Sequence, residues 1–331
     1  MMGVIAVLAA TGIAGAVLFT YAYSRRIEAR YPPVGALVDV GPGAIHVVET
    51  APEGIDRGAV LLVHGASGNF ADLHVALADR LSARGFRVFS VDRPGHGWSA
   101  RLSGRAASSP ECQADWIRAA LARRGVERAI VVVHSLAGVL GLAMALNAPQ
   151  FVRGLVLLAP VSHPWIGGVL WYYTLASSRR FGPLFRWVVL LPAGLLTLSG
   201  GVRAVFNPNP TPADYVERTR LPLMLRPWHF KANAEDVVDI EAHVVALSGR
   251  YGAIRAPTAI LTGDRDGIVY AHIHSKGCAR DIPGATLKVL EGVGHSPHHG
   301  APESVIEAIL QVDRRAREAS APSRGVLSSA G

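Results

Sequence analysis

Short apolar segments alternate with amphipathic segments along most of the chain. Apolar stretches of five or six residues predict buried strands, and helical patterns lie between them. The expected strands are residues 36–40, 44–50, 59–63, 86–91, 128–133, 154–159, 257–262 and 285–290. The expected helices are residues 70–83, 111–124, 139–148, 270–280 and 302–312. Strands that alternate with helices predict an α/β fold with a mostly parallel, eight-stranded sheet flanked by helices.

The alternation stops between residues 161 and 250, where the chain is rich in aromatic residues, Leu, Pro and Gly. This composition predicts an inserted helical cap that divides the core into residues 36–160 and 251–312. Within the cap, residues 233–247 form an amphipathic helical pattern with Asn233 as the expected N-cap. Beyond the core, residues 313–331 form a polar tail that we expect to be disordered.

The N-terminal region contains an apolar run from Val4 to Tyr23 without a charged residue. Twenty helical residues span about 30 Å, the thickness of a bilayer core, so residues 1–24 are predicted to be a transmembrane anchor. Residues 25–35 are expected to form a linker. A cleaved signal peptide is the competing interpretation, but no charged segment precedes the apolar run. The basic flank at Arg25 and Arg26 predicts a single-pass protein whose main domain is cytoplasmic.

Composition and charge narrow the range of functions. The formal net charge is +8, the basic residues are scattered, and we find no nucleic-acid-binding motif. An anionic membrane surface fits this charge better than nucleic acid. Cys112 and Cys278 lie far apart and suggest neither a disulfide framework nor a metal site.

The segment Val131-Val132-Val133-His134-Ser135-Leu136-Ala137-Gly138 combines a buried strand, a serine and the start of an apolar helix. A sharp strand-to-helix turn holds its central serine in a strained conformation and requires small neighbours two positions away on either side. Those neighbours are Val133 and Ala137, where glycine is usual. The alternative interpretation, which gives the serine no catalytic role, is an ordinary strand-turn-helix in which the serine caps the helix N-terminus.

Taken together, five motifs resemble those of the α/β-hydrolase superfamily, over about residues 36 to 312. They are His64-Gly65, Asp92-Arg93-Pro94-Gly95-His96-Gly97, His134-Ser135-Leu136-Ala137-Gly138, Gly263-Asp264-Arg265-Asp266 and Gly294-His295. The resemblance implies that Ser135 is the nucleophile, His295 the base and Asp266 the acid that orients it. It also implies that the backbone N–H groups of Ala66 and Leu136 form the oxyanion hole.

Several rival assignments stay open at this point. Asp264 is an alternative acid, although the resemblance places the acid at the second aspartate. His298 and His299 lie close to His295, and a zinc site with His272 or His274 is imaginable. The spacing typical of zinc enzymes is missing, so we expect neither a metal nor a cofactor.

Serine at the turn favours acyl transfer to water, because relatives that open epoxides or remove halogens carry aspartate there. An apolar cap favours an apolar or lipid-like ester as the substrate. We therefore expect a membrane-anchored carboxylesterase or lipase-like enzyme. The alternatives are an amide or carbon–carbon bond hydrolase, or a non-catalytic binding protein of the same fold.

Overall fold

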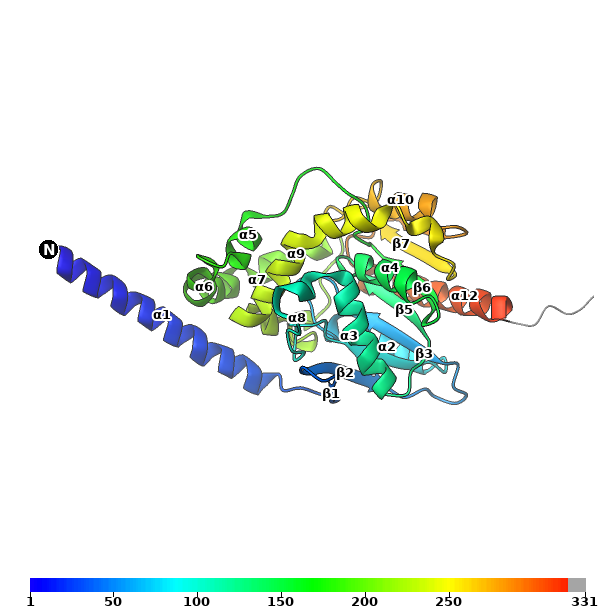
Figure 1. Cartoon of the computed structure of the whole chain (residues 1–331), viewed down its shortest axis with the longest axis horizontal. Helices are drawn as coiled ribbons and strands as arrows, with labels where there is room; N and C mark the ends of the chain where they lie inside the picture. The colour runs from blue at the N-terminus through cyan, green and yellow to red at the C-terminus, as the bar shows by residue number, and fades with distance from the viewer. Residues whose placement is uncertain (321–331) are drawn as a thin grey trace, which may run out of the picture.

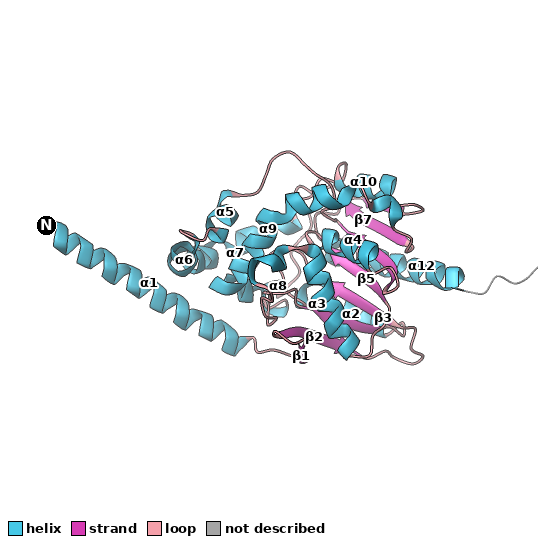
Figure 2. Ribbon diagram, in the orientation of Figure 1, coloured by secondary structure: helices cyan, strands magenta, loops and turns pink. Residues whose placement is uncertain are grey.

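The computed structural model describes residues 1–320, and its core is one eight-stranded sheet (Figures 1 and 2). The strands are β1 (Ala36–Asp39), β2 (Ala44–Thr50), β3 (Ala59–Val63), β4 (Arg87–Val91), β5 (Ala129–His134), β6 (Val152–Leu158), β7 (Thr258–Gly263) and β8 (Thr286–Leu290). Their spatial order is β1-β2-β4-β3-β5-β6-β7-β8. Only the β1–β2 and β2–β4 pairs are antiparallel. The predicted mostly parallel, eight-stranded sheet is confirmed.

Helices cover both faces of the sheet. They are α2 (Ala71–Ser82), α3 (Pro110–Arg123), α4 (Ala137–Asn147), α10 (His274–Asp281), α11 (Pro297–Gly300) and α12 (Pro302–Ser320). Side chains from α3 and α4 pack on one face of the sheet, and side chains from α2 and α12 pack on the other. Successive residues of β3 alternate between the two layers, with Leu61 facing the first and Leu62 the second. The buried strands are therefore apolar on both faces, which explains their continuous hydrophobic runs.

A helical insertion lies between β6 and β7, at the position predicted for the cap. Its elements are α5 (Trp171–Ser177), α6 (Gly182–Leu184), the π-helical η2 (Phe185–Leu190), α7 (Leu191–Phe206), α8 (Tyr215–Arg218), η3 (Leu221–Leu225), α9 (Pro227–Ser248) and η4 (Tyr251–Ala253). Helix α9 begins at Pro227, a residue that suits the first helical turn. Asn233 is therefore inside the helix, and its predicted role as the N-cap is wrong.

Buried charges attach α9 to the core. Arg93, which follows β4, donates to Asp236 of α9 at 2.6 Å, and both side chains are almost completely buried. Arg101 contacts the other carboxylate oxygen of Asp236 at 2.8 Å, and Gln113 of α3 donates to Asp236 at 3.0 Å. A buried ion pair that loses one partner leaves an uncompensated charge, which is strongly destabilising. A displacement of α9 would separate these partners, so the bonds hold the helix in one orientation over the sheet.

The N-terminal helix α1 (Met2–Arg30) has 29 residues, and its N-terminal half extends away from the rest of the molecule (Figure 1). The helix includes residues 25–30, which we expected to be part of a linker, and it ends just before Pro32 and Pro33. Within residues 1–320, two helical segments are long and apolar enough to cross a membrane, Met2–Arg30 and Gly182–Phe206.

The closing helix α12 continues to Ser320, past the boundary at residue 313 where we expected disorder to begin. Asp313 explains the extension, because its buried carboxylate binds Arg57 at 2.6 Å and Arg153 at 2.8 Å. It also accepts from Arg317 on the next turn at 3.0 Å. Residues 321–331 of the expected tail lie outside the described residues.

Candidate active site

Ser135 lies on the turn between β5 and α4, in the left-handed backbone region with a φ of 54°. Its backbone N–H donates to Leu158 at 2.9 Å, and its carbonyl accepts from Gly138 at 2.8 Å and from Val161 at 2.9 Å. A non-glycine residue with positive φ is strained, and such strain persists only where the surroundings impose it. Gly65 allows the next loop to approach, because a Cβ there would lie 2.9 Å from the Cβ of Ser135.

The turn accommodates valine at position 133 through a glycine on the facing helix. A Cβ built on Gly141 of α4 would lie 2.8 Å from Cγ2 and 3.0 Å from Cγ1 of Val133. The methyl groups of Val133 thus occupy the space that a side chain at position 141 would need. Sequence analysis identified Val133 as a departure from the usual pattern but did not detect this compensation.

The structure brings Ser135, His295 and Asp266 together, although they are separated by up to 160 residues in the sequence. The hydroxyl of Ser135 lies 2.9 Å from Nε2 of His295, and Nδ1 of His295 lies 2.8 Å from Oδ2 of Asp266. The other oxygen of Asp266 accepts the backbone N–H groups of Ile268 and Val269 at 2.8 and 3.0 Å. The carboxylate is therefore held by three donors, and it can fix the tautomer of the imidazole.

Asp264 has a different set of contacts. Its Oδ1 accepts the backbone N–H of Gly292 at 2.7 Å, and its own N–H donates to Leu290 at 3.0 Å. These bonds connect the loop after β7 with the loop after β8, which carries His295. Asp264 thus has the contacts of a residue that shapes the turn.

The loop after β3 carries Ala66, one of the two expected oxyanion donors, and the other, Leu136, precedes α4. Among the hydrogen bonds of residues 1–320, neither N–H has a protein acceptor. Asn233 of α9 holds the adjacent Ser67, because its side chain accepts the Ser67 N–H at 2.7 Å and donates to the Ser67 hydroxyl at 3.1 Å. Ser67 has a φ of 56°. Asn233 therefore fixes the strained loop, a contact that sequence analysis missed.

Buried neutral histidines surround this loop. Burial, assisted by the positive charge of Arg93, lowers the pKa of His64 to about 4. His64 accepts the backbone N–H of Arg93 at 3.1 Å, and its Nδ1 lies 2.8 Å from the carbonyl of Gly65. Burial also lowers the pKa of His96 and of His229 well below the usual value. These side chains act as uncharged hydrogen-bonding groups at neutral pH.

A second group of histidines surrounds Asp72 of α2, next to the loops that carry Ser135 and His295. One carboxylate oxygen accepts from Tyr215 at 2.9 Å and contacts His299 at 3.1 Å, and the other contacts His298 at 3.2 Å. Burial alone would raise the pKa of the Asp72 carboxyl, but His298 and His299 hold it well below the usual value. His134 contributes Nε2 to the carbonyl of His295 at 2.9 Å.

Asp72, His134 and His298 are also the described residues whose ligand atoms could hold a metal ion, since these atoms lie within 4.8 Å of one another. This grouping differs from the zinc site that the sequence suggested, because His272 and His274 are not part of it. Ring nitrogens and a hydroxyl already contact both oxygens of Asp72. The arrangement is consistent with a hydrogen-bonded support beneath the loops of Ser135 and His295.

A second serine–histidine–aspartate chain lies behind β6. The hydroxyl of Ser162 is 2.8 Å from Nδ1 of His163, and Nε2 of His163 is 3.0 Å from Asp281. Ser162 is completely buried, and its hydroxyl donates to the carbonyl of His274 at 3.1 Å. Its backbone is not in the left-handed region. Hydrogen-bond distances alone therefore do not distinguish the two serines, whereas burial and backbone strain do.

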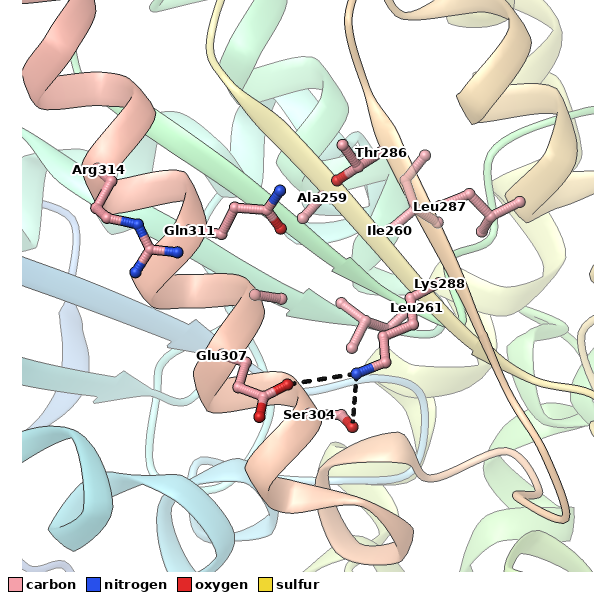
Figure 3. A pocket seen from close by; sticks show the side chains of 11 residues that line it. Ala259, Ile260, Leu261, Thr286, Leu287, Lys288, Ser304, Glu307, Gln311 and Arg314 are labelled. Carbon is pink, nitrogen blue, oxygen red and sulfur yellow. Dashed lines mark hydrogen bonds and ion pairs between the residues drawn. The ribbon is translucent and has the colours of Figure 1, made fainter.

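The space beside Ser135 is almost closed, because Ser135 is 8% exposed and His295 is 5% exposed. A small hollow of about 10 Å³ lies beside Leu136. A surface pocket of about 470 Å³ lies elsewhere, between β7, β8 and α12, where Lys288 contacts Glu307 and Ser304 (Figure 3). Neither Ser135 nor Asp266 nor His295 lines that pocket, so we do not assign it to the substrate.

A model of the alpha/beta hydrolase fold family matches residues 58–302, most of the chain. The chain belongs to the α/β-hydrolase family. The family expected from the five motifs is thus confirmed, and with it a hydrolase of this superfamily. The match covers the strands from β3 to β8 and the whole helical insertion between β6 and β7.

Two curated relatives are similar to parts of this α/β-hydrolase. An uncharacterised protein of Mycobacterium tuberculosis is 28% identical over 270 residues, which cover 76% of this chain and 74% of the relative. A 2-hydroxymuconate semialdehyde hydrolase of Pseudomonas putida is 33% identical over 134 residues, which cover 38% of this chain and 46% of that protein.

Solved structures share the fold. A carboxylesterase of Bacillus subtilis matches with a TM-score of 0.66 and 17% identity, over 90% of this chain and 98% of that one. A meta-cleavage product hydrolase of Pseudomonas fluorescens matches with a TM-score of 0.67 and 17% identity, over 86% of this chain and 99% of that one. At these identities, the likeness establishes the α/β-hydrolase architecture alone.

Proposed function

We propose that this α/β-hydrolase is a serine hydrolase that cleaves an ester bond through Ser135, His295 and Asp266. The observation that carries the proposal is the chain of hydrogen bonds from Ser135 to His295 at 2.9 Å and from His295 to Asp266 at 2.8 Å. His295 takes the proton of the serine hydroxyl as it attacks, and returns it to the leaving alkoxide. Asp266 holds the imidazole in the required tautomer and stabilises its charged form. Water then hydrolyses the acyl-enzyme by the same route.

The proposed oxyanion hole consists of the N–H groups of Ala66 and Leu136. Neither group has a protein acceptor among the described residues, so both are available to a developing negative charge. Asn233 holds the neighbouring Ser67 in place, which pre-organises the first of these donors. A donor that is fixed before the reaction needs no reorganisation when charge develops.

The proposed substrate is an ester with an apolar acyl or alkyl group. Tyr173 of α5 lies 3.4 Å from the Ser67 hydroxyl and stacks on Phe230 of α9, so an aromatic cluster stands over the oxyanion loop. Activity on p-nitrophenyl esters should rise from acetate to medium chains, because each buried methylene contributes about 0.8 kcal/mol. A strict preference for acetate would contradict an apolar pocket.

Labelling with a fluorophosphonate probe tests the nucleophile. The probe should modify the wild type and the Ser162→Ala variant equally, and it should not modify Ser135→Ala. Ser162 is the matched control because it also bonds to a histidine that contacts an aspartate, but is completely buried. Equal labelling of wild type and Ser135→Ala would refute the assignment, because another residue would then be the reactive nucleophile. A wild type that takes up no probe would favour the non-catalytic alternative.

A carbon–carbon bond hydrolase is the second candidate. The relative from Pseudomonas putida that is named a 2-hydroxymuconate semialdehyde hydrolase is 33% identical over 134 residues, and this favours it. A ring-cleavage dienoate substrate, assayed beside the p-nitrophenyl esters, separates the two candidates. Turnover of the dienoate at least tenfold above that of every ester would favour the carbon–carbon bond hydrolase.

We also propose that α1 anchors the protein in a membrane as a single span, with the hydrolase domain in the cytoplasm. The run from Val4 to Tyr23 carries no charge, and the most apolar window of α1 is not buried by the rest of the protein. Arg25 and Arg26 follow directly, and the positive-inside rule keeps such a flank cytoplasmic. A C-terminal green fluorescent protein fusion should be bright and an alkaline phosphatase fusion inactive. The opposite pattern would place the domain outside.

A further inference from the structure

Helix α1 has a free part and a docked part. Residues 1–15 are all exposed, whereas Ala16, Thr20, Ser24 and Ile27 form one face that is covered by the cap. Their spacing of three and four residues places them on the same side of the helix. Small side chains at three of the four positions allow the helix to lie close to η2 and η3.

Polar bonds fix this docking at the C-terminal end of α1. Glu28 accepts from Arg226, which precedes α9, at 3.0 Å, and the Arg226 side chain is almost completely buried. Glu217 of α8 binds Arg30 at 2.9 Å and accepts from the Tyr31 hydroxyl at 2.6 Å. Ile27 and Tyr31 pack with Leu191, Leu223 and Leu225 in one apolar cluster. The register of α1 against the cap is therefore set by specific contacts.

This register determines how deep the cap lies in the membrane. The docked face begins at Ala16, yet the uncharged run continues to Tyr23. Eight helical residues span about 12 Å. If residues 4–23 cross the bilayer, the part of the cap beside residues 16–23 must lie within about 12 Å of its surface, at the level of lipid rather than water.

The cap presents apolar side chains at this level. Phe181, Leu184, Val189 and Leu196 are exposed, with Leu196 at 85%. The exposed pair Arg179 and Arg180 comes directly before Phe181. The exposed pair Arg25 and Arg26 follows the apolar run of α1 after Ser24. Each apolar segment thus has a basic pair that can contact lipid phosphates.

The helical segment Gly182–Phe206 cannot span the bilayer, because both of its ends are held on the same side. Before it, α5 packs on α9 through the stacked rings of Tyr173 and Phe230. After it, Phe206 packs on Tyr215 of α8 and on His299 of α11, which belongs to the core domain. A helix that is long and apolar but tethered at both ends lies along the membrane surface.

We propose that the segment Gly182–Phe206 lies in the surface of an anionic phospholipid bilayer, next to α1, so that an apolar substrate reaches the site directly from the lipid. The inference rests on the anchor proposed above. The C-terminal end of α7 leads to Asn209, which accepts the N–H of Gly294 at 2.9 Å, directly before His295. Helix α7, which is proposed to contact lipid, is thus linked through Asn209 to the loop that carries His295.

Fluorophore depth measurements on the full chain test this arrangement. The variants Leu184→Cys, Leu196→Cys and Val289→Cys are each made in a Cys112→Ser background and labelled with a nitrobenzoxadiazole dye. Burial raises the pKa of the Cys278 thiol to about 12, so this buried residue does not react. The control is Val289, half-exposed on β8 at the far edge of the sheet from β1. The proteins are reconstituted in phosphatidylcholine–phosphatidylglycerol vesicles with or without nitroxide-labelled lipid.

The dyes at positions 184 and 196 should shift to the blue and lose fluorescence to the nitroxide lipid, while the dye at position 289 responds only to aqueous iodide. If the protein floats with the vesicles and all three dyes respond to iodide alone, the inference is wrong and the anchor stands. Dyes shielded from iodide but insensitive to nitroxide lipid would show that a second copy covers this face, which also overturns the inference. Failure to float would refute the anchor itself.

Discussion

The pairing of Val133 with Gly141 predicts how the turn that carries Ser135 tolerates a valine two positions before the serine. An alanine Cβ at position 141 would lie 2.8 Å from Cγ2 of Val133 and 3.2 Å from Cδ1 of Leu155, closer than ordinary contact. Overpacking of this kind typically costs about 1–3 kcal/mol. Glycine to alanine in a helix otherwise gains up to about 1 kcal/mol. We therefore expect Gly141→Ala to be neutral to destabilising by about 2 kcal/mol, after the gain in helix propensity.

The matched control is Gly200→Ala in α7, where a Cβ meets nothing within 4 Å. It reports the propensity gain alone, so the two variants should differ in unfolding free energy by about 1–3 kcal/mol. At about 2 °C per kcal/mol, thermal melting in detergent micelles resolves this difference.

A double-mutant cycle then isolates the contact. Val133→Ala alone should destabilise, because it removes two buried methyl groups worth about 0.8 kcal/mol each. In the Val133→Ala background, Gly141→Ala should become stabilising, because the new methyl group fills the space. Purely additive effects of the two substitutions, or equal melting shifts for Gly141→Ala and Gly200→Ala, would refute the packing argument.

Three further predictions concern the site and its surroundings. Asp266→Asn should lower turnover by several orders of magnitude in folded protein, whereas Asp264→Asn should mainly lower the melting temperature; the reverse ranking in kinetic assays would show that the acid is misassigned. Asn233→Ala should lower kcat more than it raises KM for p-nitrophenyl butyrate, because it frees the loop at Ser67; an effect on KM alone would indicate a substrate-binding role instead. Stability should fall as pH drops from about 6.5 to 4, because the unfolded chain takes up protons that buried histidines exclude. His64 alone, with a pKa of about 4 in the folded protein, contributes about 3 kcal/mol to this loss of stability. A melting temperature that stays constant between pH 7 and 5 would contradict this prediction.

Sequence patterns predicted the core of the fold well because its signals are local. Strands buried on both faces are continuous apolar runs, so β3 was expected at residues 59–63 and is found there. The motifs after the strands also place Ser135, Asp266 and His295 at the carboxyl edge of a parallel sheet, where loops from distant segments meet.

Features that depend on tertiary contacts could not be predicted in this way. The start of α9 was misplaced because Asn233 resembles a capping residue, whereas its side chain binds a loop 166 residues away. The length of α12 depends on Arg57 and Arg153, which neutralise Asp313 from distant parts of the chain. The room that Gly141 leaves for Val133 likewise arises only when the helix folds back on its strand.

The division of α1 at Ala16 has a practical consequence for anyone who wishes to produce this hydrolase without the free end of the helix. Removing everything before Ala36 would strip Ile27 from the apolar cluster and leave Arg226 buried without its carboxylate partner, Glu28. Beginning the chain near Ala16 would remove the exposed residues 1–15 and keep those that pack on the cap. The boundary for expression therefore lies inside the helix, at the point where its docked face begins.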